Sequence, residues 1–115
     1  MRLYHLHSLE DTDHGHVFHR LVDGAHITAG ELLFLPPGQV AHADEPRHVH
    51  ASEEIFVLLQ GRAVVHFDDG DELMGPGDVM VVEPDENHHL ESDAQDPPVL
   101  LYVHCGGSRP PGQEV

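Results

Sequence analysis

Short apolar runs separated by turn residues make up most of the chain. Residues 55–59 and 63–67 are rich in β-branched and aromatic side chains, and Gly61 and Arg62 between them predict a hairpin turn. No window of about a dozen residues has helical periodicity, and turn residues recur every eight to twelve positions or so, which is typical of an all-β sandwich or barrel. Further strands are expected at residues 17–21, 26–28, 31–35, 79–82 and 99–104.

The length predicts a single domain over residues 1–115, because a second core would leave too little apolar surface for each. The segment 106–115 is rich in Gly and Pro and is expected to be a mobile tail. A single cysteine, Cys105, excludes an internal disulfide. Because it ends an expected strand, we expect it to be a small buried apolar residue.

The net charge of the chain disfavours some classes of binding partner. It carries 21 acidic residues against 5 Arg and Lys together, a formal net charge of −16. Such a chain repels phosphate backbones and anionic lipid, so neither nucleic acid nor a membrane is expected as a partner. No apolar run approaches the roughly 20 residues of a membrane span, and the first residues lack the apolar stretch of a signal peptide, so a cytoplasmic protein is expected. The acidic surplus either keeps a small protein soluble or reflects adaptation to a salt-rich cytoplasm.

The unusual residue is histidine, of which the chain has 13. His48 and His50 are two positions apart, so on a strand they project from the same face. A tight turn after His50 would bring the carboxylate of Glu54 beside the two imidazoles. Two His and one carboxylate on one side of a metal form a facial ligand set that leaves positions open for substrate.

A fourth ligand can come from another strand, and His88 is the natural candidate. His89 would replace it after a shift of one residue, although neighbours on a strand face opposite ways. His42 and His66 are expected at the surface or behind the ligands. The histidines near the start are expected to form a solvated polar segment: His5, His7, His14, His16 and His19.

These residues resemble the cupin family. His48-x-His50-x3-Glu54-x6-Gly61 is similar to the metal-binding part of the first cupin motif, and Gly77-x10-His88 looks like the second. The resemblance covers about residues 30–105. It implies a double-sheet jelly roll, or double-stranded β-helix, with the metal inside the barrel. We expect an apolar ring around the metal that includes Phe56, Leu58, Val65, Phe67, Val81 and Tyr102.

The chain also departs from the cupin pattern. His42 stands where the first motif has a glycine, and Glu83 and Asp85 replace a proline and a glycine of the second. These changes put acidic groups near the expected site entrance and argue against a strongly anionic substrate. Tyr102 and Arg47 are the side chains most expected to contact substrate, and a residue that fills the barrel or a surface charge is an equally good interpretation of each.

We therefore expect one divalent transition metal held by His48, His50, Glu54 and His88. Fe, Mn, Ni, Cu and Zn all suit three imidazoles and a carboxylate. The resemblance implies a small-molecule enzyme, either a dioxygenase or a metal-dependent isomerase, lyase or cyclase. A non-catalytic small-ligand binding module is the alternative. Exposed strand edges, together with the resemblance, predict a homodimer.

Overall fold

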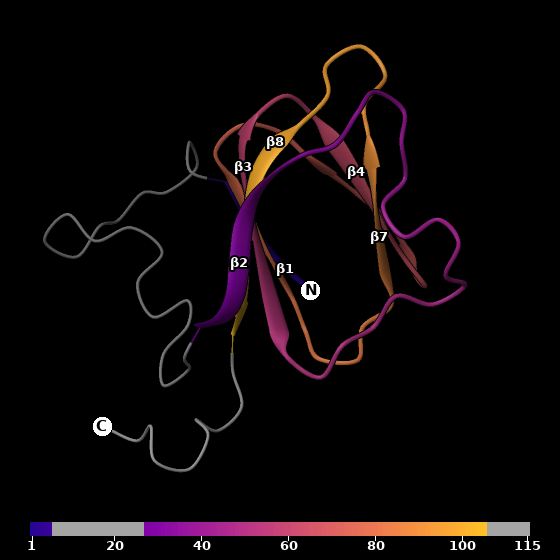
Figure 1. The fold of residues 1–115 in the computed structure, drawn as a ribbon, viewed down its shortest axis with the longest axis vertical. Coiled ribbons are helices and arrows are strands. Elements are labelled where there is room, and N and C mark those ends of the chain that lie inside the picture. The colour runs from indigo at the N-terminus through magenta and orange to yellow at the C-terminus, as the bar shows by residue number, and fades with distance from the viewer. Residues whose placement is uncertain (6–26, 106–115) are drawn as a thin grey trace, which may run out of the picture.

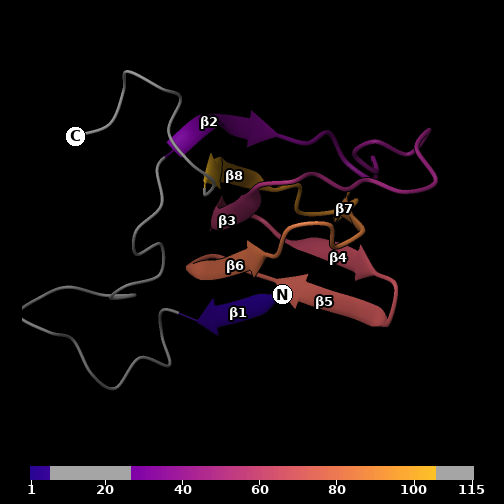
Figure 2. The same cartoon turned by 90° about the horizontal axis from the view of Figure 1, so that it is seen from below.

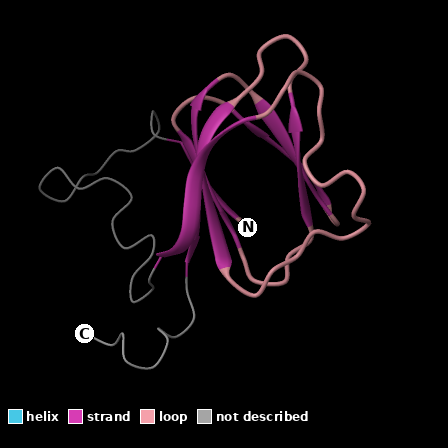
Figure 3. Cartoon of the chain, viewed as in Figure 1, coloured by secondary structure: helices cyan, strands magenta, loops and turns pink. Residues whose placement is uncertain are grey.

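The computed structural model describes residues 1–5 and 27–105, and these ranges contain strands, turns and loops but no helix (Figure 3). No segment of the described chain could therefore cross a bilayer as a helix. The expected strand at 17–21, the start of the one at 26–28 and the tail at 106–115 lie outside the described residues. The strands are β1 Arg2–His5, β2 Ile27–Phe34, β3 Glu53–Gln60, β4 Ala63–Phe67, β5 Gly70–Met74, β6 Asp78–Val82, β7 His88–Ser92 and β8 Val99–Cys105.

Two antiparallel sheets face each other across a common interior (Figure 1). One has five strands in the order β1-β6-β3-β8-β2, and the other has three in the order β5-β4-β7. The turned view shows the five strands following one another from β2 to β1, with β7, β4 and β5 beside them (Figure 2). The expected all-β jelly-roll barrel is confirmed.

The predicted hairpin at Gly61 and Arg62 is wrong, because β3 and β4 belong to different sheets. Gly61 has φ = 83°, and a Cβ on it would lie 2.2 Å from the carbonyl oxygen of Pro97. Only glycine fits this close approach. The Arg62 amide then donates to the Asp96 carbonyl at 2.8 Å, which ties the crossover to the loop before β8.

The other expected strands are found, with changes at their ends. Residues 79–82 and 99–104 lie within β6 and β8, and residues 27–34 form one continuous strand where the sequence suggested two. Three strands were missed: β1, β5 and β7. β7 has the sequence HHLES, in which the buried positions alternate with partly exposed ones. Because histidine and serine occupy two of the three buried positions, the sequence lacks the alternation of apolar and polar residues by which a strand is predicted.

The main core fills the space between the sheets. Five of the expected interior residues, namely Phe56, Leu58, Val65, Phe67 and Tyr102, belong to this cluster or pack against it. Val81 instead joins a second cluster with Ile55, Val79 and Cys105, on the outer face of the five-stranded sheet. Its side chain is fully buried there, so its expected place in the interior is wrong. Cys105 is buried at 1% exposure, as expected.

Candidate metal centre

The interior opens into a cavity of about 580 Å³ that the candidate ligands line. Apolar side chains from both sheets form much of its wall, among them Phe56 and Leu90. All four predicted metal ligands line it: His48, His50, Glu54 and His88. The structure therefore brings together, in one cavity, residues that lie up to 40 positions apart in the sequence.

His48 and His50 lie in the loop before β3, not on a strand as the sequence argument assumed. Backbone hydrogen bonds nevertheless hold this loop in place. The His88 amide donates to the His48 carbonyl at 3.1 Å, and the Asp85 amide donates to the His50 carbonyl at 2.9 Å. The side chain of Asn87 also accepts a bond from the His48 amide at 2.8 Å. Bonds from the loop between β6 and β7 and from the first residue of β7 thus do the positioning that a strand ladder was expected to do.

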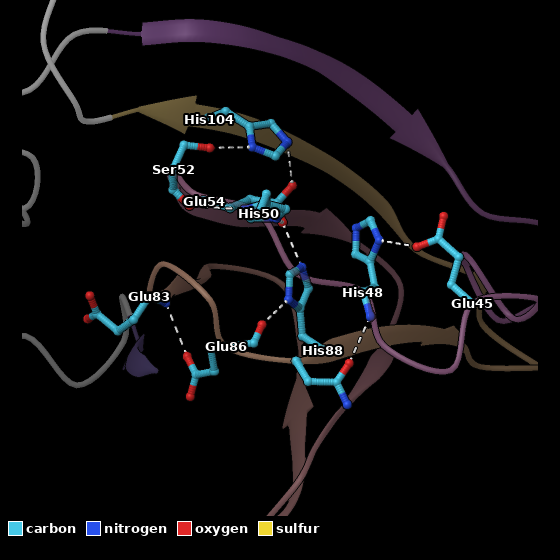
Figure 4. A network of polar contacts seen from close by, with 10 residues as sticks. Glu45, His48, His50, Ser52, Glu54, Glu83, Glu86, His88 and His104 are labelled. Carbon is cyan, nitrogen blue, oxygen red and sulfur yellow. Dashed lines mark hydrogen bonds and ion pairs between the residues drawn. The ribbon is translucent and has the colours of Figure 1, made fainter.

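Glu54 and His88 come from opposite sheets and meet in the interior (Figure 4). Glu54 is the second residue of β3 and is 5% exposed, while His88 begins β7 and is 2% exposed. Oε1 of Glu54 lies 2.9 Å from Nε2 of His88 and 3.1 Å from Nε2 of His50. A single carboxylate oxygen therefore faces two imidazoles.

The other ring nitrogens of these histidines face hydrogen-bond acceptors. Nδ1 of His88 lies 2.8 Å from the Glu86 carbonyl, and Nδ1 of His50 lies 2.9 Å from the Ser52 carbonyl. Nδ1 of His48 lies 2.8 Å from Oε2 of Glu45. Carbonyl and carboxylate oxygens only accept, so each Nδ1 carries the proton, and in the neutral ring Nε2 is left with a lone pair. This is the arrangement found in metal-binding histidines, whose second nitrogen donates to a protein oxygen.

The position of the ring protons shows whether these residues fit a metal ion. An unprotonated Nε2 and a carboxylate oxygen at about 3 Å repel each other unless a cation lies between them. That cation is either a proton on each ring or one metal ion that binds all of them. Ligand atoms of His48, His50 and His88 lie within 4.8 Å of one another, so one ion can reach all three. The donor set fits a divalent transition metal.

The pKa values of the ionisable side chains in the site are set by burial and by neighbouring groups, which act in opposite directions. Burial acts to raise the pKa of Glu54, but the hydrogen bond from His88 and the charges of His104, His88 and His50 outweigh it, so the pKa is lowered. Burial acts to lower the pKa of His88, and its bonds to Glu54 and the Glu86 carbonyl outweigh it, so that pKa is raised. For His48, burial prevails over the bond to Glu45, and the pKa is lowered. The buried carboxylate thus stays negative and attracts a cation.

In the described part of the chain, two other groups of side chains have ligand atoms close together. His42, Glu45 and His48 form one at the rim. The rings of His42 and His48 are stacked, with centroids 3.8 Å apart and planes 10° apart. An ion cannot lie in the planes of two stacked rings, so this group is a poor ligand set. His50, Glu54 and His104 form the other group, inside the cavity.

His104 is the site residue that the sequence argument missed. It lies on β8 directly opposite Glu54, and its Nε2 is 3.1 Å from Oε2 of that carboxylate. Leu100, Tyr102 and His104 share the inner face of β8, so strand alternation could have shown that His104 points inward. The pairing of β3 with β8 could not be read from the sequence.

The remaining candidates divide between the cavity and the surface. Tyr102 lines the cavity and donates to Glu31 at 2.7 Å, whereas Arg47 pairs with Asp68 at the surface and does not line it. Glu83 and Asp85 do not line it either, so the expected acidic entrance is not found there.

The other histidines that can be placed lie outside the ligand group. His89 binds the Glu45 carbonyl at 2.8 Å and does not line the cavity, so His88 is the inward neighbour of the two. His66 lies on β4 and is partly exposed, as expected. His42 is also exposed, but it lines the cavity rim beside His48. His5 pairs with Asp78 at 2.6 Å, while His7, His14, His16 and His19 lie outside the described residues.

The double-sheet β-barrel is a jelly roll, and its interior cluster of histidine and glutamate could hold a metal ion. A family model for the cupin domain matches residues 39–104. The chain belongs to this family. No curated protein matches the sequence.

Solved structures with the same fold are varied in their described roles. A cupin protein from Bacteroides fragilis is 22% identical, with a TM-score of 0.59 over 74% of this chain and 70% of that one. A predicted oxalate decarboxylase from Thermotoga maritima is 27% identical, with a TM-score of 0.55 over 68% and 66%. A sugar phosphate isomerase of the cupin superfamily from Silicibacter pomeroyi is 24% identical, with a TM-score of 0.54 over 69% of this chain and 50% of that one.

Proposed function

We propose that the chain binds one divalent transition metal through Nε2 of His48, His50 and His88 and through Oε1 of Glu54. The observation that carries this proposal is the position of the proton in the three neutral rings, which is on Nδ1. Each Nδ1 faces an acceptor, so the three Nε2 lone pairs are left for a single cation, and ligand atoms of the three rings lie within 4.8 Å of one another. The buried Oε1 of Glu54 lies beside two of these rings, those of His50 and His88. Fe, Mn, Ni, Cu and Zn all accept such a donor set.

We further propose that the metal and the cavity serve a small-molecule enzyme of the dioxygenase type. When bound, the ion supplies a Lewis acid and, if it is redox-active, a site for oxygen chemistry. The chain's own residues shape what can enter. Leu33, Leu35 and Phe56 exclude water from one part of the wall, and the Tyr102–Glu31 pair offers hydrogen bonds on another.

The lining also favours a substrate class. Among the described residues that line the cavity there is no Arg, and the basic side chains are all histidines. A phosphate or a dicarboxylate would find no permanent positive charge there except the metal. We therefore assign neither the substrate of the sugar phosphate isomerase nor that of the predicted oxalate decarboxylase, and we expect an uncharged, oxygen-bearing molecule. Isomerase, lyase or cyclase chemistry on such a molecule is the alternative.

Elemental analysis of protein purified without added metal tests the proposal. One equivalent of Fe, Cu, Ni or Mn per chain is expected, and Zn as the sole metal would favour the isomerase or lyase alternative. Thermal shifts of the metal-loaded protein should be larger with neutral hydroxycarbonyl compounds than with phosphate or malonate. In the same elemental analysis, His88→Ala should lose most of the metal. His89→Ala is its matched control, because His89 adjoins His88 but does not line the cavity. Protein that binds no transition metal would remove the basis of the proposal.

The homodimer expected from the sequence stays a prediction. β2 is an outermost strand of the five-stranded sheet, and it exposes Leu32 at 66% and Phe34 at 54%. If a second copy covers this strand, Leu32→Glu should shift sedimentation toward the monomer. Leu73→Glu is the control, because Leu73 is 73% exposed on the other sheet. A wild-type chain that sediments as a monomer at micromolar concentration would refute the dimer.

A further inference from the structure

His104 differs from the three proposed ligands in the partner of its Nδ1. That nitrogen lies 3.1 Å from the hydroxyl oxygen of Ser52, whereas Nδ1 of each ligand histidine faces an oxygen that only accepts. A hydroxyl can donate as well as accept. His104 is therefore the imidazole of this cluster that can keep Nδ1 unprotonated and carry its proton on Nε2 while it stays neutral.

Nε2 of His104 faces the carboxylate oxygen of Glu54 that is not the hydrogen-bond partner of His50 or His88. It lies 3.1 Å from Oε2, while His50 and His88 face Oε1. Figure 4 shows the chain of contacts from Ser52 through His104 to Glu54. Because β8 pairs with β3, His104 sits directly across from Glu54, and the bond does not depend on a loop.

We propose that His104 is a positioning residue for the metal ligand Glu54, an inference that rests on the proposed metal site. Ser52 donates its hydroxyl proton to Nδ1, and His104 donates the Nε2 proton to Oε2. This bond occupies one carboxylate oxygen and leaves Oε1 for the ion, so that Glu54 binds through a single oxygen. Ser52 then orients two rings, because its carbonyl accepts from His50 and its hydroxyl serves His104.

A competing arrangement uses the same atoms differently. Ligand atoms of His50, Glu54 and His104 also lie within 4.8 Å of one another, so His104 could itself bind the ion through Nε2. Its proton would then have to sit on Nδ1, with Ser52 as the acceptor. The two arrangements place the proton on different ring nitrogens, and this makes them distinguishable.

Nitrogen-15 NMR of the ring nitrogens in the zinc-loaded protein separates them. We expect His104 to be protonated at Nε2 and unprotonated at Nδ1, and the three ligand rings to show the opposite tautomer with Nε2 bound to zinc. A proton on Nδ1 of His104, with zinc on its Nε2, would overturn the inference while leaving a zinc site in place. Wild-type protein that binds no zinc would overturn this inference and the proposed function together.

Substitutions give a second readout, the dissociation constant for Zn²⁺ in competition with a chelator. Glutamine can place an amide N–H near the position of Nε2, and asparagine near that of Nδ1. His104→Leu and His104→Asn should weaken zinc binding about 10- to 100-fold, as is usual when a hydrogen bond to a metal ligand is lost, and His104→Gln should stay within a few-fold of wild type. If the Gln and Leu variants lose zinc affinity equally, the hydrogen-bond role is contradicted. Equal losses would mean that His104 itself binds the ion, since an amide cannot replace an imidazole ligand. Circular dichroism of the metal-free variants checks that each one folds.

Discussion

The interior cluster around Glu54 and the surface cluster around His66 both bring histidine together with carboxylate. At the surface, His66 on β4 has Nδ1 at 2.8 Å from Asp71 and Nε2 at 3.4 Å from Glu91. The His66 side chain is 36% exposed, whereas that of His88 in the interior is 2% exposed. Both clusters place carboxylates around imidazole nitrogens, so residue type alone does not distinguish them.

Burial and the number of rings make the difference. The bonds to Asp71 and Glu91 outweigh partial burial and raise the pKa of His66, so one proton between two solvated carboxylates satisfies the surface cluster. Inside, the ring of His88 lies 5.0 Å from that of His50 and 4.9 Å from that of His48. Protonating all three would crowd positive charges in a partly buried site. A single divalent ion satisfies the same lone pairs with less repulsion.

The largest expected effect is the loss of metal from the interior cluster. His50→Ala and His88→Ala should each lose most of the bound metal, because the remaining donors compete poorly with water. His48→Ala should behave in the same way. His66→Ala should retain it, since His66 belongs to the surface cluster. Metal per chain, measured by elemental analysis after dialysis against the same buffer, decides the comparison; full loading of both interior variants would contradict it.

Glu54→Gln is expected to have the next largest effect. It removes the negative charge between His88 and His50, and the metal-free protein should lose about 3 kcal/mol of unfolding free energy below neutral pH, as for a broken buried ion pair. Glu91→Gln in the surface cluster is the control and should change stability by about 0.5 kcal/mol or less. Urea unfolding of the two metal-free variants gives both values. Similar losses in the two variants would show that burial does not separate the clusters.

The effect of pH on stability should differ between the metal-free and the zinc-loaded protein. In metal-free protein the raised pKa of His88 contributes stability that is complete below the unfolded-state value and is lost as pH rises through the folded pKa. The lowered pKa of Glu54 contributes stability above its ordinary value, which is lost as pH falls through the folded pKa. Metal must displace protons, so the rise in melting temperature on adding zinc should be larger near pH 8 than near pH 6. A zinc effect that does not change with pH would contradict ligation by these rings.

The smallest effect is expected at the surface. His66→Gln removes a raised pKa, so it should cost a little stability that is complete below about pH 6.5 and fades as pH rises through the folded pKa of His66. Because the group is more than a third exposed, the loss should stay within about 0.5 kcal/mol. Melting curves of metal-free wild type and variant across this range test it. A loss as large as that of Glu54→Gln would mean that the surface cluster is as strongly coupled as the interior one.

The sequence predicted which residues would meet in one cavity better than it predicted the sheet topology. His48, His50, Glu54 and His88 all line one cavity, because motif spacing reports how loops and strand starts converge. The crossover at Gly61 was misread as a hairpin, since the same glycine suits a turn within a sheet and a passage between sheets. His104 was missed for a related reason. Its importance comes from the pairing of β3 with β8, and register is a long-range property that local pattern does not record.

X-ray absorption spectroscopy of the zinc-loaded protein tests the central claim most directly, because it counts the atoms bound to the ion. We predict a first shell with three imidazole nitrogens and one carboxylate oxygen, at the roughly 2.0–2.2 Å distances usual for such zinc ligands. The imidazole signal should fall to two rings or vanish with the metal in His88→Ala, and it should not change in His89→Ala. A shell of carboxylate and water oxygens, unchanged in both variants, would contradict the claim.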